Sequence, residues 1–411
     1  MIPDSNWSKS FRYNFRDSLA PSSFEELQEM VASASTLKVL GSRHSFNAIA
    51  DGETALLMNR LPLDPVISAN RQQVSIGGHA TYGELALFLA GHGLAIHNLA
   101  SLPHISIAGA IATATHGSGD RNGNLATAVC GLEFVTADGG FVAAKRGDAN
   151  FDGMVVHLGA LGVVTRVTLD IRPSFDIAQY VYGGLEWREL FANFDAIMAS
   201  GYSVSIFTGW GEEAGQIWVK TADLSAPAPA EIFGARLAAV KHHPLRGLDP
   251  ENVTDQLGLP GLWSDRLPHF KMGFTPSNGD EIQSEFHIPR RHAAAAIEAV
   301  LAVREHFAPV LQVAELRTAA ADGLWLSPQY QRDTLSMHFT WLRELEAVTA
   351  AVRPIEQALA PFDALPHWGK VFSPAAVGQR YLKLAQFRAL RDRMDPNRKF
   401  SNRWLEETIF G

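Results

Sequence analysis

The chain has 411 residues, of which 46% are hydrophobic and 19% are charged. This length predicts two domains, and the composition is typical of a soluble globular protein rather than a disordered one. The formal net charge is -8, from 35 basic and 43 acidic residues. Because no basic run is present that would coat a phosphate backbone, the sequence argues against nucleic acid as a partner.

Cysteine content and hydropathy indicate a compartment. The single cysteine, Cys130, excludes an intramolecular disulfide and leaves too few thiols for a thiol-ligated zinc site, so we expect no metal. The start, "MIPDSNWSKSFRYNF", lacks a basic stretch followed by an apolar core, which argues against a secretory signal. No apolar run approaches the roughly 20 residues that would span a bilayer. The simplest expectation is a cytoplasmic protein.

Elements of the first half follow from local patterns. Residues 21–35 are predicted to hold a helix, because two overlapping Ser-x-x-Glu capping boxes precede apolar residues at helical spacing. A strand at 37–41 follows and runs into a Gly-Ser turn. Residues 73–96 predict a strand, a Gly-Gly turn and a helix that extends through Leu89 and ends near Gly93. Residues 98–124 are so rich in glycine and small side chains that neither a packed helix nor a strand is expected there.

A hairpin is predicted around Asp138 and Gly139, between two strand-like runs. Residues 162–171 alternate like a half-buried strand and end a first domain near residue 175. Residues 202–224 predict a meander of strands. Residues 225–270 are rich in Pro, Gly and His and are predicted to be a long irregular connection, which in a compact domain is usually a functional loop.

Three later strands are predicted to be apolar on one face and polar on the other, because their residues alternate in character. They cover 281–289, 311–319 and 335–341, with amphipathic helices near 290–307 and 343–360. This order favours an antiparallel sheet with helices on its apolar side, an α+β arrangement. Its polar face can simply meet solvent. The alternative is that this face, dominated by His, Gln, Glu and Arg, lines a site that binds hydroxyl groups.

Two loops of small residues, "VLGSRHS" and the segment 98–124, offer closely spaced backbone N–H groups that can hold a pyrophosphate. A nicotinamide-type fingerprint would need Gly-x-Gly-x-x-Gly between a strand and a helix. That arrangement is missing from the sequence. A doubly wound nucleotide-binding fold is therefore disfavoured.

Several motifs together resemble a known family. "VLGSRHSFN", "NLASLPHISIAGAIATATHGSG", "VAELRT", "PHWGKVF" and "DPNRKFSN" resemble, in order and spacing, those of the alditol oxidases, also called xylitol oxidases. These are FAD-linked enzymes of the vanillyl-alcohol-oxidase type. The resemblance covers nearly the whole chain. It implies an α+β fold of two domains, with an FAD-binding domain at 1–175 completed by 371–411, and a substrate-binding domain at 176–370.

The resemblance also implies how the cofactor is held. FAD would be attached covalently through His44, which follows the Gly-Ser turn, at the 8α-methyl group of the flavin. Many relatives have Gly where this chain has Arg43. The implied FAD contacts are Val39, Leu40, Gly41, Ser42, Arg43, His44, Ser45, Ser101, Ser106, Gly109, Ala112, Thr113, Ala114, Thr115, His116 and Val163.

The implied reaction is hydride transfer from C1 of an alditol to the flavin, which gives an aldose, with O2 reduced to H2O2. The catalytic residues would be Ser101, Glu315, Arg317 and Lys370, with Gln283 and His338 as supporting lining. Glu315 and Arg317 are at positions i and i+2 of one predicted strand, so both side chains lie on one face and can bind adjacent hydroxyls. No obligate protein partner is implied, and a monomer is expected.

Three alternatives remain open at this point. An aldonolactone oxidase or dehydrogenase of the same fold would use another substrate or electron acceptor, and Ala100 is the position expected to govern access of oxygen. "HGSG" at 116–119 is similar to oxyanion segments of esterases, but the chain has no Gly-x-Ser-x-Gly elbow. A sugar-binding protein that had lost its flavin would lack the tether, whereas His44 is present.

Overall fold

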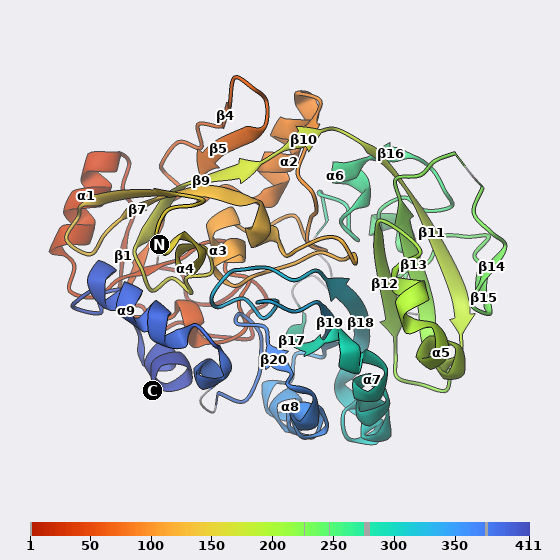
Figure 1. Cartoon of the computed structure of the whole chain (residues 1–411). Helices are drawn as coiled ribbons and strands as arrows, with labels where there is room; N and C mark the ends of the chain where they lie inside the picture. The colour runs from red at the N-terminus through yellow and green to blue at the C-terminus, as the bar shows by residue number, and fades with distance from the viewer. Residues whose placement is uncertain (1, 226, 246, 275–279, 375–376) are drawn as a thin grey trace.

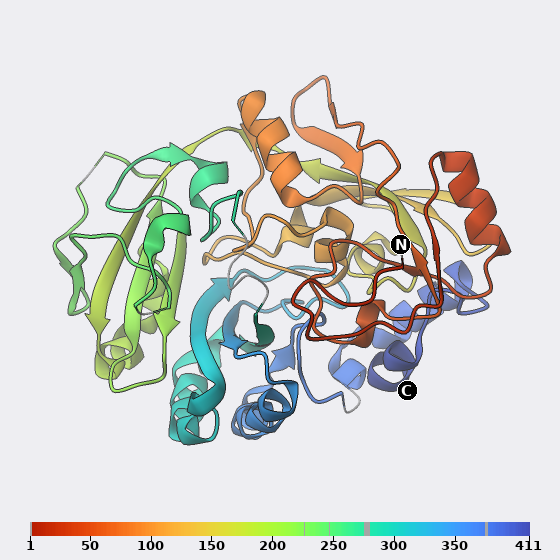
Figure 2. The same cartoon turned by 180° about the vertical axis from the view of Figure 1, so that it is seen from behind.

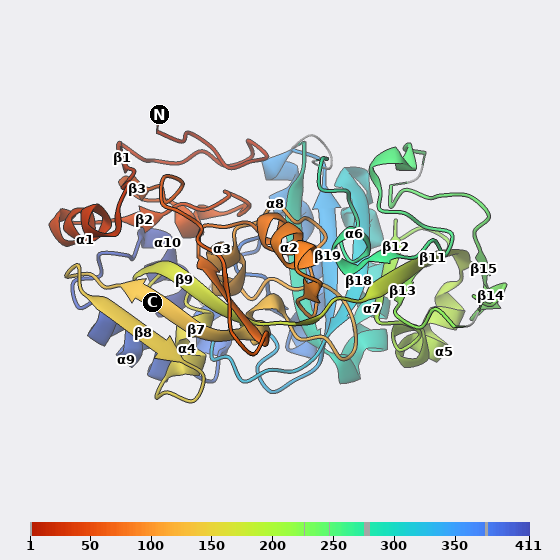
Figure 3. The same cartoon turned by 90° about the horizontal axis from the view of Figure 1, so that it is seen from above.

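A computed structural model describes residues 2–225, 227–245, 247–274, 280–374 and 377–411. Two halves lie side by side, and both ends of the chain belong to the same half (Figure 1, Figure 3). The half that carries the termini holds three small sheets. The other half is built on one large sheet.

The first half contains a five-stranded antiparallel sheet of order β4-β5-β9-β7-β8, a three-stranded parallel sheet of order β1-β3-β2, and the pair β10-β6. The strands of this half are β1 (Asp17–Leu19), β2 (Lys38–Val39), β3 (Thr54–Leu56), β4 (Val66–Ile67), β5 (Gln73–Gly77), β6 (Leu94–Ala95), β7 (Val129–Val135), β8 (Phe141–Lys145), β9 (Val163–Asp170) and β10 (Arg172–Pro173). Its helices are α1 (Phe24–Ser33), α2 (Tyr82–Gly91), α3 (Ile107–Ala112) and α4 (Phe151–Val155).

Local signals of this half are confirmed. At α1, the Ser23 side chain accepts from the backbone N–H of Glu26, while Glu26 accepts from Ser22. Gly139 takes φ +83° in the turn between β7 and β8, a conformation that favours glycine. Cys130 lies buried on β7.

The expectation for residues 98–124 was wrong in one part. Residues 107–112 form α3, a short helix, because Ile107 and Ile111 are fully buried in the main core of the first half while small residues fill the rest of the turn. The glycine-rich composition of the whole segment obscured this helix, although three of its six residues are alanine, a strong helix former. The rest of the segment runs as loop up to a 3-10 turn at Leu125–Ala128.

The large sheet has the order β14-β15-β11-β13-β12-β18-β19-β17-β20, with β16 paired to β11. Its strands are β11 (Asp176–Leu185), β12 (Ser203–Thr208), β13 (Gly215–Thr221), β14 (Glu231–Ile232), β15 (Ala235–Leu237), β16 (Gly261–Leu262), β17 (Ile282–Pro289), β18 (Leu311–Ala319), β19 (Thr334–Trp341) and β20 (Leu365–Pro366). Its helices are α5 (Trp187–Met198), α6 (Trp263–Arg266), α7 (Ala293–Ala302) and α8 (Leu345–Leu359).

Helices α5, α7 and α8 lie together along one side of this sheet (Figure 1). They share an apolar core with the inward side chains of the central strands, among them Phe286, Leu316, Met337 and Phe339. The alternating polar residues lie on the opposite face, as the sequence predicted, and this α+β arrangement is confirmed. In the ladder, His338 of β19 is the register partner of Glu285 on β17 and of Glu315 on β18.

Residues 225–270 are not wholly irregular, since they contribute β14, β15, β16 and the single-turn helix α6. A 3-10 turn forms at Pro250–Asn252, and the other described residues of this segment run as loop. After β20 the chain returns to the first half through α9 (Leu384–Met394) and α10 (Arg403–Leu405), in blue in Figure 2. There Phe400 packs in one cluster with Leu27 and Leu37. The domain limits at 175 and 371 remain predictions. Within the described ranges, none of the helices has the length and apolar character needed to cross a membrane.

Candidate active site

A cavity of about 710 Å³ lies where the polar face of the large sheet meets the loops of the first half. Its lining includes residues 38–46 and parts of 100–116 from the first half. The large sheet contributes polar residues of β17, β18 and β19, and the loop after β20 contributes residues 367, 369 and 370. The polar face of the sheet is therefore not simply a solvent-exposed surface.

All six predicted catalytic residues line this cavity, namely Ser101, Gln283, Glu315, Arg317, His338 and Lys370. Most of the predicted cofactor contacts do so as well: Val39, Leu40, Gly41, Ser42, Arg43, His44, Ser45, Ser106, Gly109, Ala112, Thr113, Thr115 and His116. Ala114 and Val163 are fully buried and do not belong to the lining. Ala100, the position expected to govern access of oxygen, also lines the cavity.

The two predicted small-residue loops touch each other at the cavity. The Ser106 backbone N–H donates to Ser42 Oγ at 2.9 Å. A Cβ added to Gly41 would meet the Ser106 side chain at less than 3.0 Å, so the close approach requires glycine. Arg43 takes φ +63°, a left-handed backbone conformation that favours glycine. The residues present therefore fit a cradle in which a ligand contacts main chain.

His44 lies at one end of this cradle. Its ring stacks on Trp7, with 5.0 Å between ring centroids and 22° between planes. Burial lowers the pKa of His44 to about 4, so the imidazole is neutral at pH 7. Its Nδ1 is buried without a hydrogen-bond partner among the described residues. A neutral, oriented ring of this kind suits a covalent tether.

Glu285 of β17 is the centre of a buried charge network. Its Oε1 lies 2.7 Å from Arg317 Nη2 and 3.0 Å from His116 Nε2, and its Oε2 lies 2.7 Å from Lys370 Nζ. Burial alone would raise the pKa of Glu285, but the charges of Lys370, His116 and Arg317 outweigh it and hold the pKa well below its usual range. Glu285 thus joins strands β17 and β18 to the loop that carries His116 and to the loop after β20 that carries Lys370.

Glu315 of β18 forms the second acidic group. Its Oε1 lies 2.8 Å from His269 Nε2, and its Oε2 lies 3.5 Å from Arg317 Nε and 3.9 Å from His338 Nδ1. Burial opposes ionisation, yet Arg317 and His269 lower the pKa of Glu315, so it is a carboxylate at pH 7. Arg317 Nη1 donates to Ser101 Oγ at 3.3 Å.

Comparison with known proteins identifies the family. An alditol oxidase from Streptomyces sp. is 46% identical over 414 residues, covering 99% of both chains. The chain belongs to the alditol oxidase family. This confirms the predicted family and the predicted FAD-linked oxidoreductase class.

Family models agree with this assignment to the alditol oxidases. The model for an FAD binding domain matches residues 18–145, and the model for D-arabinono-1,4-lactone oxidase matches residues 276–408. FAD is thereby confirmed as the cofactor. More distant relatives are the L-gulono-1,4-lactone dehydrogenase of Mycobacterium tuberculosis, 27% identical over 95% of both chains, and the L-gulonolactone oxidase of Bos taurus, 25% identical over 98% of both.

The fold is similar to that of cholesterol oxidase from B. sterolicum, with a TM-score of 0.76 and 15% identity, over 98% of this chain and 96% of that one. This likeness confirms the two-domain FAD-linked oxidase fold. At such low identity it says nothing about the substrate of this alditol oxidase relative.

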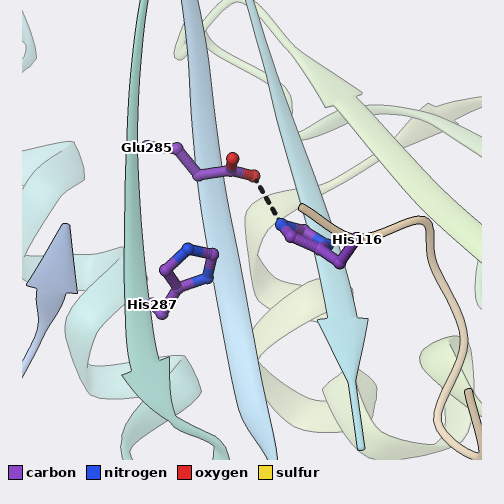
Figure 4. Close-up of side chains that lie close together, drawn as sticks. All are labelled: His116, Glu285 and His287. Carbon is purple, nitrogen blue, oxygen red and sulfur yellow. Dashed lines mark hydrogen bonds and ion pairs between the residues drawn. The ribbon is translucent and has the colours of Figure 1, made fainter. Parts of the chain in front are cut away.

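His116, Glu285 and His287 place one ligand atom each within 4.8 Å of the others, as a metal site would (Figure 4). In this alditol oxidase relative the Glu285 carboxylate already contacts two cationic side chains, Arg317 and Lys370. These charges repel a divalent cation. His287 Nδ1 in turn lies 2.8 Å from Ser336 Oγ. The cluster is better described as part of the charge network.

Sequence reasoning missed three polar residues of this alditol oxidase site. Glu285 was placed on the polar face but given no role, although its i+2 spacing from Gln283 was a usable signal. His367 lines the cavity and belongs to the same motif, "PHWGKVF", as the predicted residue Lys370. Burial and the charge of Lys370 lower the pKa of His367 to about 3. His269 lies in the segment predicted as irregular, where no local pattern marks a contact with Glu315.

Proposed function

We propose that this chain is an oxidase that converts the terminal C1 hydroxyl of alditols, such as xylitol and sorbitol, to the aldehyde of an aldose and reduces O2 to H2O2. One observation carries the proposal. The buried network of Glu285, Arg317, Lys370 and Glu315 borders the same cavity as the small-residue cradle at 39–45. A polyol bound on the network therefore shares its cavity with the cofactor.

Two neighbouring groups suit adjacent hydroxyls. Ionised Glu315 can only accept hydrogen bonds and the Arg317 guanidinium can only donate them. Their charged atoms lie 3.5 Å apart, which matches the pair of donor and acceptor that vicinal hydroxyls present. Gln283, which donates to Glu281 Oε1, lines the same wall. We propose that Glu315 holds the C2 hydroxyl and so selects C1 for oxidation.

The proton of the C1 hydroxyl must leave as the C–H bond breaks. Lys370 and Arg317 supply positive charge that stabilises a developing alkoxide, and Ser101 beside Arg317 orients it. Burial and the charge of Lys370 hold the pKa of His338 well below its usual range, so this ring is neutral at pH 7 and can exchange a hydrogen bond with the hydroxyl. Bound FAD would supply the acceptor for the hydride and the route by which the electrons reach O2.

We further propose that His44 is the covalent attachment point of FAD, and that Arg43, Ala114 and Val163 contribute contacts to it. The neutral, stacked imidazole supports this assignment. A monomer without an obligate partner, located in the cytoplasm, remains the expectation.

The test begins with the absorbance spectrum of purified protein before and after acid precipitation. Flavin that stays with the pellet supports the tether, and His44→Ala should release it to the supernatant while noncovalent binding persists. Xylitol and sorbitol should then produce H2O2 and an aldose. Glu315→Gln should lower kcat/KM for xylitol by roughly a hundredfold or more, because a charged hydrogen bond to the substrate is lost. Flavin in the wild-type supernatant contradicts the tether, and a colourless protein contradicts the oxidase.

A lactone oxidase or dehydrogenase is the second candidate. The match of residues 276–408 to the D-arabinono-1,4-lactone oxidase model favours it. Turnover of an aldonolactone in place of xylitol, or activity with an artificial acceptor but not with O2, would select this candidate. An Ala100→Gly variant measured with both acceptors tests whether this position governs reaction with oxygen.

A further inference from the structure

A lysine is buried behind the polar wall of the large sheet. Lys220 of β13 is 1% exposed. Its Nζ donates to the Leu267 carbonyl, to the Pro268 carbonyl at 3.1 Å and to His269 Nδ1 at 3.3 Å. An ammonium has three donors and no acceptor. The three contacts therefore use every donor of a charged lysine, and a buried charge is retained only where it is satisfied in this way.

His269 continues the chain of contacts to the site. Its Nε2 lies 2.8 Å from Glu315 Oε1, and the ring packs edge-on against Phe207 and Trp218 at 5.1 Å and 5.6 Å between centroids. Burial, followed by the charge of Lys220, lowers the pKa of His269 to about 4, so the ring is neutral. The two aromatic side chains prevent the ring from turning away.

The donors and acceptors at the two ends fix the tautomer of His269. The Glu315 carboxylate can only accept, so Nε2 of the neutral ring carries the hydrogen and Nδ1 is an acceptor. Burial lowers the pKa of Lys220 to about 7. Because Nδ1 and two carbonyls all accept, the ammonium form is the one that donates to each of them. Both conditions are met by a single neutral tautomer, in which the hydrogen lies on the side of the cavity. In other proteins too, a hydrogen-bond partner on the far nitrogen of a functional histidine fixes its tautomer and orientation.

We propose that Lys220 and His269 are positioning residues that set the regioselectivity of the oxidation, by holding Glu315 Oε1 so that Oε2 is left for the substrate. The inference rests on the proposed function, because it assigns Glu315 to the hydroxyl beside the reacting carbon. His269 itself lines the cavity. Oε2 is the oxygen nearest to Arg317 and His338, so its orientation decides whether a second hydroxyl can be accepted.

Loss of Lys220 leaves His269 Nδ1 a buried acceptor without its donor, so the ring has a partner at only one end. The bond from its Nε2–H to Glu315 Oε1 is then weaker, and the carboxylate is held less firmly. The kcat/KM for a substrate with a hydroxyl beside the reacting carbon should fall, whereas the kcat/KM for a substrate without that hydroxyl should not. A purely structural role for Lys220 would reduce turnover of both substrates alike.

The experiment compares kcat/KM for 1,2-butanediol and for 1-butanol in flavin-loaded wild type, Lys220→Met, Lys220→Arg and Lys399→Met. Lys399 is a matched control, since its buried ammonium likewise has three acceptors, the backbone carbonyls of Val31, Ala32 and Ala137, and it lies outside the cavity lining. The diol-to-alcohol ratio of kcat/KM should fall roughly ten- to a hundredfold in Lys220→Met, mainly through KM. It should recover in part in Lys220→Arg and stay unchanged in Lys399→Met.

An unchanged ratio in Lys220→Met, or an equal fall in Lys399→Met, would overturn the inference. If Lys220→Met does not fold, His269→Phe and His269→Gln decide the matter. His269→Phe removes the donor to Glu315 and should lower the ratio, while His269→Gln keeps an N–H and should retain more of it. Wild type that oxidises no polyol or diol at all would instead refute the proposed function.

Discussion

At the scale of single residues, Glu285 is the most connected group of the site. One fully buried carboxylate satisfies Arg317, Lys370 and His116 at 2.7 to 3.0 Å. Removing one partner of a buried ion pair leaves an uncompensated charge, which costs more than the pair itself contributes. The position therefore matters for the fold as much as for the chemistry that we propose.

Glu285→Gln should lower the free energy of unfolding by about 3–5 kcal/mol, because two buried cations lose their counter-charge. Urea unfolding at pH 7, with both proteins loaded with flavin, measures the loss. Glu298→Gln, on the exposed side of α7, is the control and should change stability by no more than about 0.5 kcal/mol. A Glu285→Gln midpoint equal to that of wild type would show that the network does not stabilise the protein.

The stability that Glu285 contributes should depend on pH. The pKa of Glu285 is depressed in the folded state below its ordinary value of 4.5, so the stabilisation is fully present above that value and lost as pH falls toward the folded pKa. The stability difference between wild type and Glu285→Gln should therefore be constant from pH 8 to about pH 5.5 and narrow below about pH 4.5. Urea midpoints at half-unit pH intervals measure it, and a difference that grows in acid would contradict the assignment.

At the scale of elements, the junction of the β2 loop with α3 forms the cradle. A side chain at Gly41 would collide with Ser106 and disturb the bond from the Ser106 N–H to Ser42 Oγ. Gly41→Ala should therefore lower the flavin content of the purified protein, read from the ratio of absorbance near 450 nm to that at 280 nm. Gly91→Ala at the end of α2 has open space around its Cβ and should leave that ratio unchanged. Full flavin loading of Gly41→Ala would show that the loops do not form the cradle.

The elements also show how far the sequence could be read. Two-residue alternation predicted the polar faces of β17, β18 and β19, because it is a local property of each strand. It could not reveal that Glu285 meets His116 and Lys370, which are 169 and 85 positions away. Those contacts depend on strand register and on a loop from the other half. In the sequence, Lys220 cannot be distinguished from an exposed charged residue of a meander, because its burial depends on tertiary packing.

At the scale of the whole molecule, the cavity joins two halves with separate cores, since loops of one half and strands of the other line it together. A ligand held by both halves stabilises the folded state by mass action. Flavin-free His44→Ala protein should accordingly gain about 2.7 kcal/mol of apparent stability at 100-fold excess of FAD over its Kd. Thermal unfolding across an FAD titration measures this gain. Riboflavin, which lacks the pyrophosphate, is the control and should give a smaller shift; an equal shift would argue that the cradle does not bind that group.

The register that sets Glu285 and Glu315 opposite His338 limits how the length of this chain can change. Because successive side chains of a strand alternate between faces, deleting one residue from β19 would turn Phe339 toward the cavity and His338 toward the helices. The same holds for β17 and β18. The wall can therefore be altered by replacing residues, whereas a single-residue insertion or deletion is compatible with the site only in the loops beyond the strand ends.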